Sequence, residues 1–304
     1  MPEISVIMGV HNQLNREQLF DAVRSILNQT FHDFELIIYD DGSCREAAGL
    51  LLEVGKLDSR IRLMGENENH GLGFSLNACI KAAKGKYIAR MDADDISYPN
   101  RLMIQKKFLD EHEEVSWCGC NTELFDDEGI WGRREMPVHP KQKDFLKYSP
   151  FVHPTVMYRR EVLEQCDGYA EAKENLRCED YEIFMRLQSS GFQGANIQQY
   201  LFGYREDYGS YKKRTAKNRF REARCRLHGF QVMHILFPTG WFYVLRPIFA
   251  VLLPVRILSL LKRRESAIHT KRKEGGQIGQ EEAFNAYHWS HAHSYPDCRV
   301  QSSS

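Results

Sequence analysis

The stretch Tyr87-Ile88-Ala89-Arg90-Met91-Asp92-Ala93-Asp94-Asp95 joins a short apolar run to three carboxylates that are separated by a single alanine. The apolar run is typical of a buried strand, and the acids follow where that strand ends. Clustered carboxylates repel one another, and hard oxygen ligands suit Mg²⁺ or Mn²⁺. We therefore expect Asp92 and Asp94 to hold a metal–diphosphate group. The alternative is a solvated acidic turn or helix cap, because Asp is a favoured residue in both.

The composition narrows the class of protein. The chain has 304 residues, which suits one large domain or a domain with extensions, and 41 Lys and Arg balance 41 Asp and Glu. This balance gives no global charge for nucleic acid, which is not an expected partner. Met1 leads directly into a strand-like run, so we expect no signal peptide. The eight cysteines form no C-x-x-C pair, which favours reduced thiols in a cytoplasmic protein.

The first third of the chain alternates between strand and helix patterns. Helical spacing or strand-like runs predict strands at 4–8, 34–39, 61–64 and 87–91 and helices at 17–29, 47–56 and 75–83. Such alternation predicts an α/β fold with a mostly parallel sheet covered by helices. In these sheets ligands bind beyond the carboxyl ends of the strands. Asn12, Asp41, Asn69 and the Asp92/Asp94 pair all follow strands, so we expect them to converge on one edge.

Two glycines in the loop after the third strand invite comparison with a dinucleotide-binding fingerprint. Gly71 and Gly73 do not fit it, because the third glycine position is Leu76 and the loop does not follow the first strand. We interpret them as turn residues that allow the backbone to approach a ligand closely.

The pattern changes after Pro99. We predict a helix at 101–111, antiparallel strands at 115–125 and 129–136, a strand at 151–158 and a helix that begins near Glu179. Mixed strands and loops of this kind suit an acceptor pocket.

The last third combines basic and apolar character. Residues 215–236 are helical in pattern and basic, and residues 237–264 are apolar and aromatic. No uncharged run of ~18 residues occurs there, so we do not expect a spanning helix. Aromatic residues beside cations favour an interfacial membrane helix, and a core or dimer helix is the alternative. After Gly275 we expect a polar, disordered tail whose histidines bind metal at most adventitiously.

Together, these motifs resemble the family 2 glycosyltransferases of the bacterial surface-polysaccharide type. The resemblance covers residues 3–205 and departs at His11, where the family more often has Tyr. The matching pieces, in the family's order, are Ser5-Val6-Ile7-Met8 with Asn12, Ser25-Ile26-Leu27-Asn28-Gln29-Thr30-Phe31, Asp40-Asp41-Gly42-Ser43, Asn69 and Gly71 with Leu76-Asn77, Met91-Asp92-Ala93-Asp94-Asp95, Pro99 with Arg101-Leu102, His153-Pro154, and Glu179-Asp180 with Arg186.

The resemblance implies a role for each matching residue. Asp41 would hydrogen-bond a uracil ring, Asp92 would contact the ribose or the metal, and Asp94 would coordinate the metal that bridges the diphosphate. Asp180 would be the general base. The other implied donor-binding residues, in the loop over the nucleotide or after the third strand, are Gly9, Val10, Asn12 and Asn69.

The resemblance also implies an architecture and a reaction. The fold would be a Rossmann-like GT-A domain at 1–210, with a nucleotide-binding half at 1–98 and an acceptor-side half at 99–210. A helical extension at 211–265 and the tail at 266–304 would follow. The cofactor would be Mn²⁺ or Mg²⁺. The enzyme would transfer a sugar, with inversion, from a UDP-sugar to a saccharide or lipid-linked saccharide. This reaction would belong to exopolysaccharide, capsule or lipopolysaccharide synthesis. The enzyme would be cytoplasmic, at the cytoplasmic face of the membrane.

Asp180 has two interpretations. It stands at a predicted helix start, where the positive end of the helix dipole would favour its ionised form and keep it available as a base. The alternative is an ordinary N-cap, and Glu179 with Glu182 resembles a capping arrangement.

Two other functions compete with glycosyl transfer. A sugar-phosphate nucleotidyltransferase would need a glycine-rich, basic loop after the first strand, whereas the loop from Gly9 has no Lys or Arg before Arg16. A non-catalytic, membrane-associated protein of the same fold is disfavoured because the chain has all four expected carboxylates: Asp41, Asp92, Asp94 and Asp180.

Overall fold

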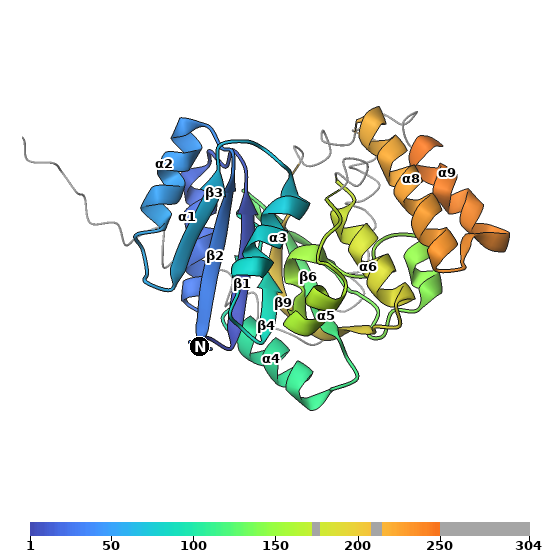
Figure 1. Ribbon diagram of the computed structural model, residues 1–304, viewed down its shortest axis with the longest axis horizontal. Helices are drawn as coiled ribbons and strands as arrows, with labels where there is room; N and C mark the ends of the chain where they lie inside the picture. Colours follow the sequence, from blue (N-terminus) through green and yellow to red (C-terminus); the bar gives the residue numbers. More distant parts are fainter. Residues whose placement is uncertain (172–176, 208–214, 250–304) are drawn as a thin grey trace, which may run out of the picture.

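The computed structural model describes residues 1–171, 177–207 and 215–249. Within these residues a nine-stranded sheet forms the centre of the molecule, with helices on both faces (Figure 1). The strand order is β3-β2-β1-β4-β8-β6-β9-β5, and β7 pairs with β6 outside this path. The strands are β1 Ile4–Val10, β2 Phe34–Asp41, β3 Ile61–Glu66, β4 Tyr87–Arg90, β5 Ile96–Ser97, β6 Trp117–Asp126, β7 Gly129–Arg134, β8 Met157–Arg159 and β9 Gly194–Arg205.

The first four strands are all parallel, as their sequence pattern predicts. Ile4 of β1 pairs with Phe34 of β2 on one side and with Tyr87 of β4 on the other, and β3 extends the sheet beyond β2. Every residue of β1 except Gly9 is buried, because helices cover both faces of the sheet. The parallel arrangement brings the carboxyl ends of these strands to one edge.

The second half of the sheet is mixed. β8 runs antiparallel to β4 and to β6, whereas β6 and β9 pair in parallel over most of their length. β6 and β7 form the predicted antiparallel pair, closed at Asp126 and Gly129. The sheet therefore continues without a break from the nucleotide-binding half predicted at 1–98 into the acceptor-side half.

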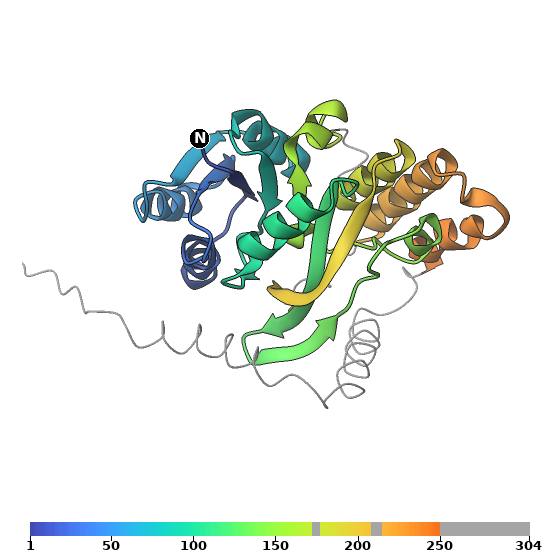
Figure 2. The ribbon, with the colours of Figure 1, turned by 90° about the horizontal axis from the view of Figure 1, so that it is seen from below.

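The helices form two layers. One cluster of buried side chains joins β1, β2 and β4 to α1, α2 and α4, and a second cluster joins the opposite face to α3, α5 and α6. Beyond α6, α8 and α9 pack at the end of the molecule far from α1 and α2 (Figure 2). The bounds are α1 Arg16–Leu27, α2 Arg45–Val54, α3 Leu72–Ala82, α4 Arg101–Glu111, α5 Arg160–Gln165, α6 Glu179–Ser189, α8 Ala216–Val232 and α9 Trp241–Phe249, with short helices η1 Gln142–Leu146, η2 His153–Thr155 and η4 Leu236–Gly240.

Some predicted elements are wrong. The strand predicted at 151–158 contains the short helix η2 at His153–Thr155, because Pro154 has no backbone N–H to donate to a neighbouring strand. Only the last two residues of the predicted strand, Met157 and Tyr158, lie in β8. The predictions also omit β9 and α5. Gly73 is not a turn residue: it lies in the first turn of α3, where an added Cβ would be 3.3 Å from the Ala170 carbonyl oxygen. Gly71 does occupy the turn, with φ of 97°.

The C-terminal extension is helical as far as the structure describes it. α8 and α9 account for residues 216–232 and 241–249, and none of the helices in the described part of the chain is both long and apolar enough to cross a bilayer. The rest of the predicted 237–264 segment, from residue 250, lies outside the described residues, as does the predicted polar tail.

Candidate active site

A cavity of about 1010 Å³ lies at the carboxyl edge of the parallel strands and is lined by both halves of the sheet. One wall comes from β1, β2, β4 and α3, and the other from β7, η2, α6 and α8. Six of the predicted site residues line this cavity: Gly9, Val10, Asp41, Asn69, Asp92 and Asp180. The predicted convergence of strand ends holds for Asp41, Asn69 and Asp92, whereas Asn12 and Asp94 are not part of the lining. Asp180 of α6 lines the same cavity.

Asp41 ends β2 as a buried carboxylate that organises the loop before α3. Its Oδ1 accepts a hydrogen bond from the His70 amide at 2.9 Å, and its Oδ2 accepts one from the Gly71 amide at 2.8 Å. The Asn69 side chain donates to the Asp41 carbonyl at 3.2 Å. A carboxylate oxygen can accept a second hydrogen bond, so Asp41 retains acceptor capacity toward the cavity.

His11 and Asn12 tie the loop after β1 to the loop after β2. His11 Nδ1 donates to the Asp41 carbonyl at 2.8 Å, which leaves Nε2 to accept from the Asn12 side-chain amide at 2.9 Å. Asn12 Oδ1 accepts from the Cys44 amide at 2.8 Å. Asn12 itself is exposed and does not line the cavity, because its side chain is used in this loop contact. His11 lines the cavity in its place.

Three carboxylates gather where β4 ends. Ligand oxygens of Asp92, Asp94 and Asp95 all lie within 4.8 Å of one another. Asp95 is buried, its Oδ1 accepts from the Arg205 amide of β9 at 2.8 Å, and its Oδ2 has no hydrogen-bond partner among the described residues. Burial, followed by the charges of Asp94 and Asp92, raises the pKa of the Asp95 carboxyl well above its ordinary range.

This cluster has the donor set of a divalent metal site. Carboxylate oxygens are the hard ligands that Mg²⁺ and Mn²⁺ prefer, and a bound cation would remove the repulsion that raises the pKa of Asp95. Asp92 borders the cavity, whereas Asp94 belongs to the cluster but not to the cavity lining. The predicted pair therefore lies together, and the structure adds Asp95 as a third carboxylate.

Asp180 is the second residue of α6. The N-cap position is Cys178, which makes no side-chain cap hydrogen bond, so Asp180 is not the N-cap. Its carboxylate does accept hydrogen bonds from the backbone amides of Asp180 and Tyr181 in the first turn. Glu182 does not form a capping box either, since it pairs with Arg186 at 2.7 Å. Desolvation, followed by the charge of Glu179, raises the pKa of Asp180 to about 6.

This shift of the Asp180 pKa has the opposite direction to the sequence prediction. The backbone amides of Asp180 and Tyr181 and the charge of Arg90 do lower the pKa, but they only partly offset the cost of burying the carboxylate. The Asp180 side chain is half-buried. It lines the cavity, where protein atoms replace much of the water that would otherwise solvate the carboxylate. A carboxylate with a pKa near 6 is a stronger base than an exposed Asp and is still ionised at neutral pH.

The wall around Asp180 holds polar groups to which the sequence analysis gives no chemical role. His153 Nε2 lies 2.8 Å from the Tyr169 hydroxyl, and burial, aided by Arg90, holds the pKa of His153 well below its usual value. This histidine is therefore neutral at physiological pH. Arg133 and Arg134 of β7 are paired with Glu123 and Glu206 respectively, at 2.9 and 2.6 Å. Their spacing in the sequence carries no signal of these pairings, which depend on the register of β6, β7 and β9.

Comparison with known proteins identifies the family. The family model described as glycosyl transferase family 2 matches residues 5–167. The O-antigen biosynthesis glycosyltransferase WbnJ of Escherichia coli is 32% identical over 227 residues, which cover 73% of this chain and 85% of that protein. The UDP-Gal:alpha-D-GlcNAc-diphosphoundecaprenol beta-1,3-galactosyltransferase of Escherichia coli is 27% identical over 267 residues, covering 83% of this chain and 92% of that protein.

Solved structures support the same fold. The mannosyltransferase PcManGT from Pyrobaculum calidifontis, in complex with GDP-Man and Mn²⁺, superposes with a TM-score of 0.58 at 14% identity, covering 96% of this chain and 80% of that chain. At this identity the likeness concerns the fold alone. The family model, the relatives and the fold agree with the resemblance found in the sequence. The chain thus belongs to glycosyl transferase family 2 and is a glycosyltransferase, which sets aside the nucleotidyltransferase and the non-catalytic alternatives.

Proposed function

We propose that this enzyme transfers a sugar, with inversion, from a UDP-sugar to a hydroxyl of a lipid-linked saccharide during surface-polysaccharide synthesis. The observation that carries the proposal is the cavity bordered by Asp41 and Asp92 on one wall and by Asp180 on the other. Donor-side and base-side groups thus face one space, as a displacement at one carbon requires. The printed names of two relatives, which refer to O-antigen biosynthesis and to a diphosphoundecaprenol acceptor, support the substrate class.

The proposed chemistry divides the work between the two walls. Asp92, Asp94 and Asp95 would hold a divalent cation, which when bound would stabilise the negative charge of the departing diphosphate. Asp180 would take the proton from the acceptor hydroxyl as it attacks the anomeric carbon from the opposite side. One in-line displacement inverts that carbon, and no carboxylate nucleophile is required, unlike in retaining glycosidases.

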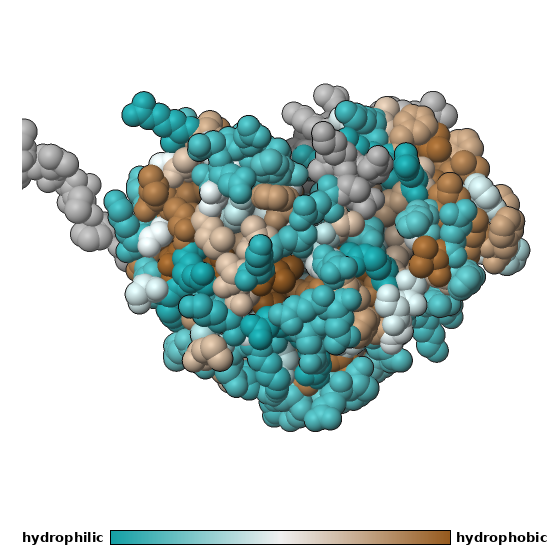
Figure 3. Space-filling view, in the orientation of Figure 1, coloured by the Kyte–Doolittle hydropathy of each residue, from teal (hydrophilic) through white to brown (hydrophobic). Residues whose placement is uncertain are grey.

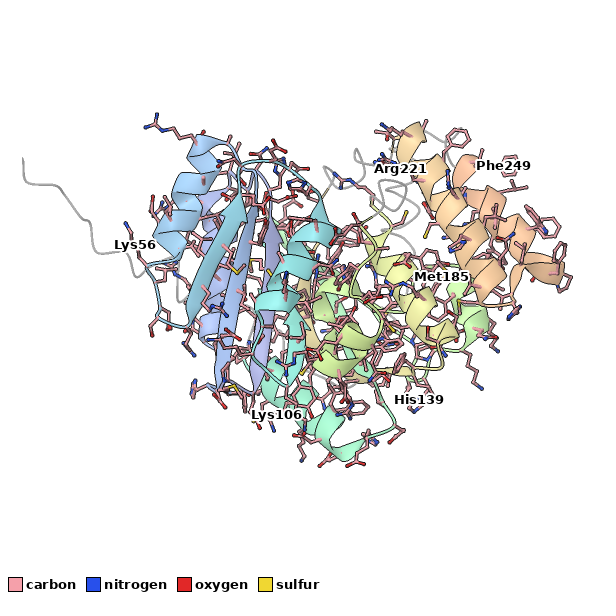
Figure 4. All side chains as sticks on the ribbon, in the orientation of Figure 1. Lys56, Lys106, His139, Met185, Arg221 and Phe249 are labelled. Atoms are coloured by element: carbon pink, nitrogen blue, oxygen red, sulfur yellow. The ribbon has the colours of Figure 1, made fainter. Side chains whose placement is uncertain are left out.

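The domain division follows from this assignment. Residues 1–98 would bind the donor, residues 99–210 would contribute the base and the acceptor wall, and residues 211–265 would bring the enzyme to its acceptor. The cavity draws its lining from both halves and reaches α8 through Arg221, which supports a role for the start of the extension near the site. In Figure 4, Arg221 lies on the flank of α8 nearer the centre of the molecule.

The test of the function is a transfer assay. The full chain is incubated with a panel of nucleotide sugars and an acceptor extract, with and without Mn²⁺, and the small products are identified. We expect nucleoside diphosphate to be released only when metal and acceptor are both present, and the product to have the opposite anomeric configuration to the donor. Retention of configuration would contradict the single displacement.

The first prediction concerns the nucleotide base. Because Asp41 is buried at the cavity and keeps acceptor capacity, we expect UDP with Mn²⁺ to bind ~10–100-fold more tightly than GDP, the effect of one hydrogen bond to a charged group. Calorimetry with both nucleotides measures this ratio. Tighter binding of GDP, the nucleotide type bound by the mannosyltransferase, would remove the uracil assignment while leaving the fold unchanged.

The second prediction concerns the membrane. An apolar surface on η4 and α9, formed by Phe237, Trp241, Phe242, Leu245 and Phe249, leaves 40–76% of each side chain exposed. Figure 3 shows brown, hydrophobic atoms gathered over this end of the molecule. We propose that this surface sits in the headgroup region at the cytoplasmic face, and that the cations of the following segment contact anionic lipids.

Flotation of the full chain with anionic liposomes tests this proposal. Replacing Phe237 and Phe242 by Ser should lower the bound fraction by at least ~10-fold, because each exposed ring loses the free energy of burial in lipid. The control is Leu52→Ser on α2, which removes an apolar side chain that is 60% exposed at the other end of the molecule. A double variant that floats like the parent would exclude this surface as the membrane contact.

A further inference from the structure

Arg90 is a buried cation in the cavity that the sequence motifs do not explain. It is the last residue of β4, only 2% of its surface is exposed, and it lines the cavity. Its Nη1 lies 2.5 Å from Oδ2 of Asp92, whose side chain is 31% exposed. The contact is an ion pair without hydrogen-bond geometry, and Nε has no hydrogen-bond partner among the described residues. Arg90 is therefore held mainly by charge.

The charge of Arg90 acts on both walls of the cavity. On its own wall it pairs with Asp92 and favours the ionised form of Asp95. On the opposite wall it lowers the pKa of Asp180 and of His153. A buried guanidinium requires compensating negative charge, and here the compensation comes from carboxylates that belong to different walls. Arg90 thus lines the same cavity as the proposed base, and its charge acts on that base and on the donor-side carboxylates.

We propose that Arg90 is a positioning residue that serves both walls: it orients the Asp92 carboxylate for the donor and provides the countercharge of Asp180. This inference rests on the proposed function and adds to it a group that contacts neither reacting atom. Arginine suits the role because its guanidinium is delocalised, weakly hydrated and charged at every physiological pH.

Arg177 and Arg221 also line the cavity, but the cation whose charge lowers the pKa of Asp180 is Arg90. Glu179, on the same helix, opposes the ionised form of Asp180. Glu222 and Arg226 of α8 are paired with each other at 3.0 Å, so their charges largely cancel. The buried side chains nearby are uncharged between pH 5 and 9. Burial holds the pKa of His153 low and raises the pKa values of Tyr158, Tyr169 and Tyr181. The pKa of Cys178 is raised first by its hydrogen bond with Cys225 and then by burial.

The test uses two variants of the full chain, Arg90→Gln without the charge and Arg90→Lys with it. In Arg90→Gln we expect the acid limb of the transfer rate to move up by about one pH unit or more, because Asp180 loses its nearby opposite charge. The loss of activity relative to the parent should then be larger at pH 6 than at pH 8.5. Arg90→Lys should keep the acid limb in place. A purely structural role predicts the same loss at every pH.

Calorimetry of UDP with Mn²⁺ tests the other half of the proposal without any transfer assay. Both variants should bind ~10–100-fold more weakly, the usual cost of losing a partner that orients a ligand-holding side chain. If Arg90→Gln does not fold, Arg90→Lys decides: parent-like affinity in that variant overturns the proposal. Arg62→Gln is the matched control, since Arg62 pairs with buried Glu35 near the Lys84 amide, outside the cavity lining.

The outcomes separate this inference from the proposed function. The proposed function would be refuted if the parent showed no transfer or if Asp180→Asn transferred sugar normally. In either case, calorimetry of the Arg90 variants would still show whether Arg90 orients the Asp92 carboxylate. The inference alone would be refuted by a different combination of results. Transfer would depend on Asp180, but Arg90→Gln would leave both the acid limb of the rate and the affinity for UDP unchanged.

Discussion

Replacing Asp180 by Asn should lower the rate of sugar transfer by ~10²–10⁴-fold, the usual contribution of a positioned general base. The substitution keeps size and shape but removes the proton acceptor. Affinity for UDP with Mn²⁺ should barely change, because Asp180 belongs to α6 and not to the strand ends that carry Asp41 and Asp92. Transfer with acceptor and calorimetry with UDP are the two measurements, and Glu164→Gln, an exposed acid on α5, is the control.

The position of Asp180 makes this test decisive. Asn caps helices about as well as Asp, so a capping role would leave both activity and stability intact. The N-cap of α6 is Cys178, however, and Asp180 follows it within the helix. Near-normal turnover in Asp180→Asn would therefore move the base elsewhere, and buried Glu179 beside it would be the next residue to replace.

The pH dependence of transfer should report the protonation of Asp180. Desolvation raises the pKa of Asp180 to about 6 in the free enzyme, and the base works only when deprotonated. The kcat/KM of transfer, which reports the free enzyme, should thus be level above this pKa and fall about tenfold per pH unit below it. In Asp180→Asn the residual rate should lose this acid limb. A parent enzyme whose rate falls only below pH 4 would contradict the buried environment of Asp180.

Replacing Asp94 by Ala should abolish metal-dependent donor binding and lower transfer by ~10²–10³-fold, comparable to the loss of one group that stabilises developing negative charge. The reason is the cluster of Asp92, Asp94 and Asp95, which a divalent cation would neutralise. Calorimetry of UDP with and without Mn²⁺ measures the binding, and EDTA treatment of the parent should reproduce the loss.

The control for Asp94→Ala is Glu113→Ala, which removes an exposed carboxylate in the loop after α4. Thermal unfolding of both variants without metal separates an effect on the site from an effect on the fold. The metal assignment would be refuted if Asp94→Ala bound UDP with Mn²⁺ as tightly as the parent does. An unchanged stability with lost metal dependence is the expected combination.

The sequence by itself determined the parallel half of the fold and most of the donor side. Its strands are short apolar runs with periodic helices between them, so local pattern and tertiary structure agree from residue 4 to residue 91. Parallel strands deliver their carboxyl ends to one edge, which is why strand order alone places Asp41, Asn69 and Asp92 together. Asn12 is the exception, because a side chain in a loop can turn to its neighbouring loop instead of the cavity.

Only the tertiary structure decided the groups that meet across the sheet. β9 brings the Arg205 amide to Asp95, and α6 brings Asp180 to face β4, over separations of about a hundred residues that no local pattern records. The pKa of Asp180 rises because its desolvation depends on the walls around it, whereas the sequence shows only the helix start, which favours the charged form. The burial of Arg90 beside the Asp92 carboxylate is of the same kind, since charge and burial act through space and depend on which segments the folded chain brings together.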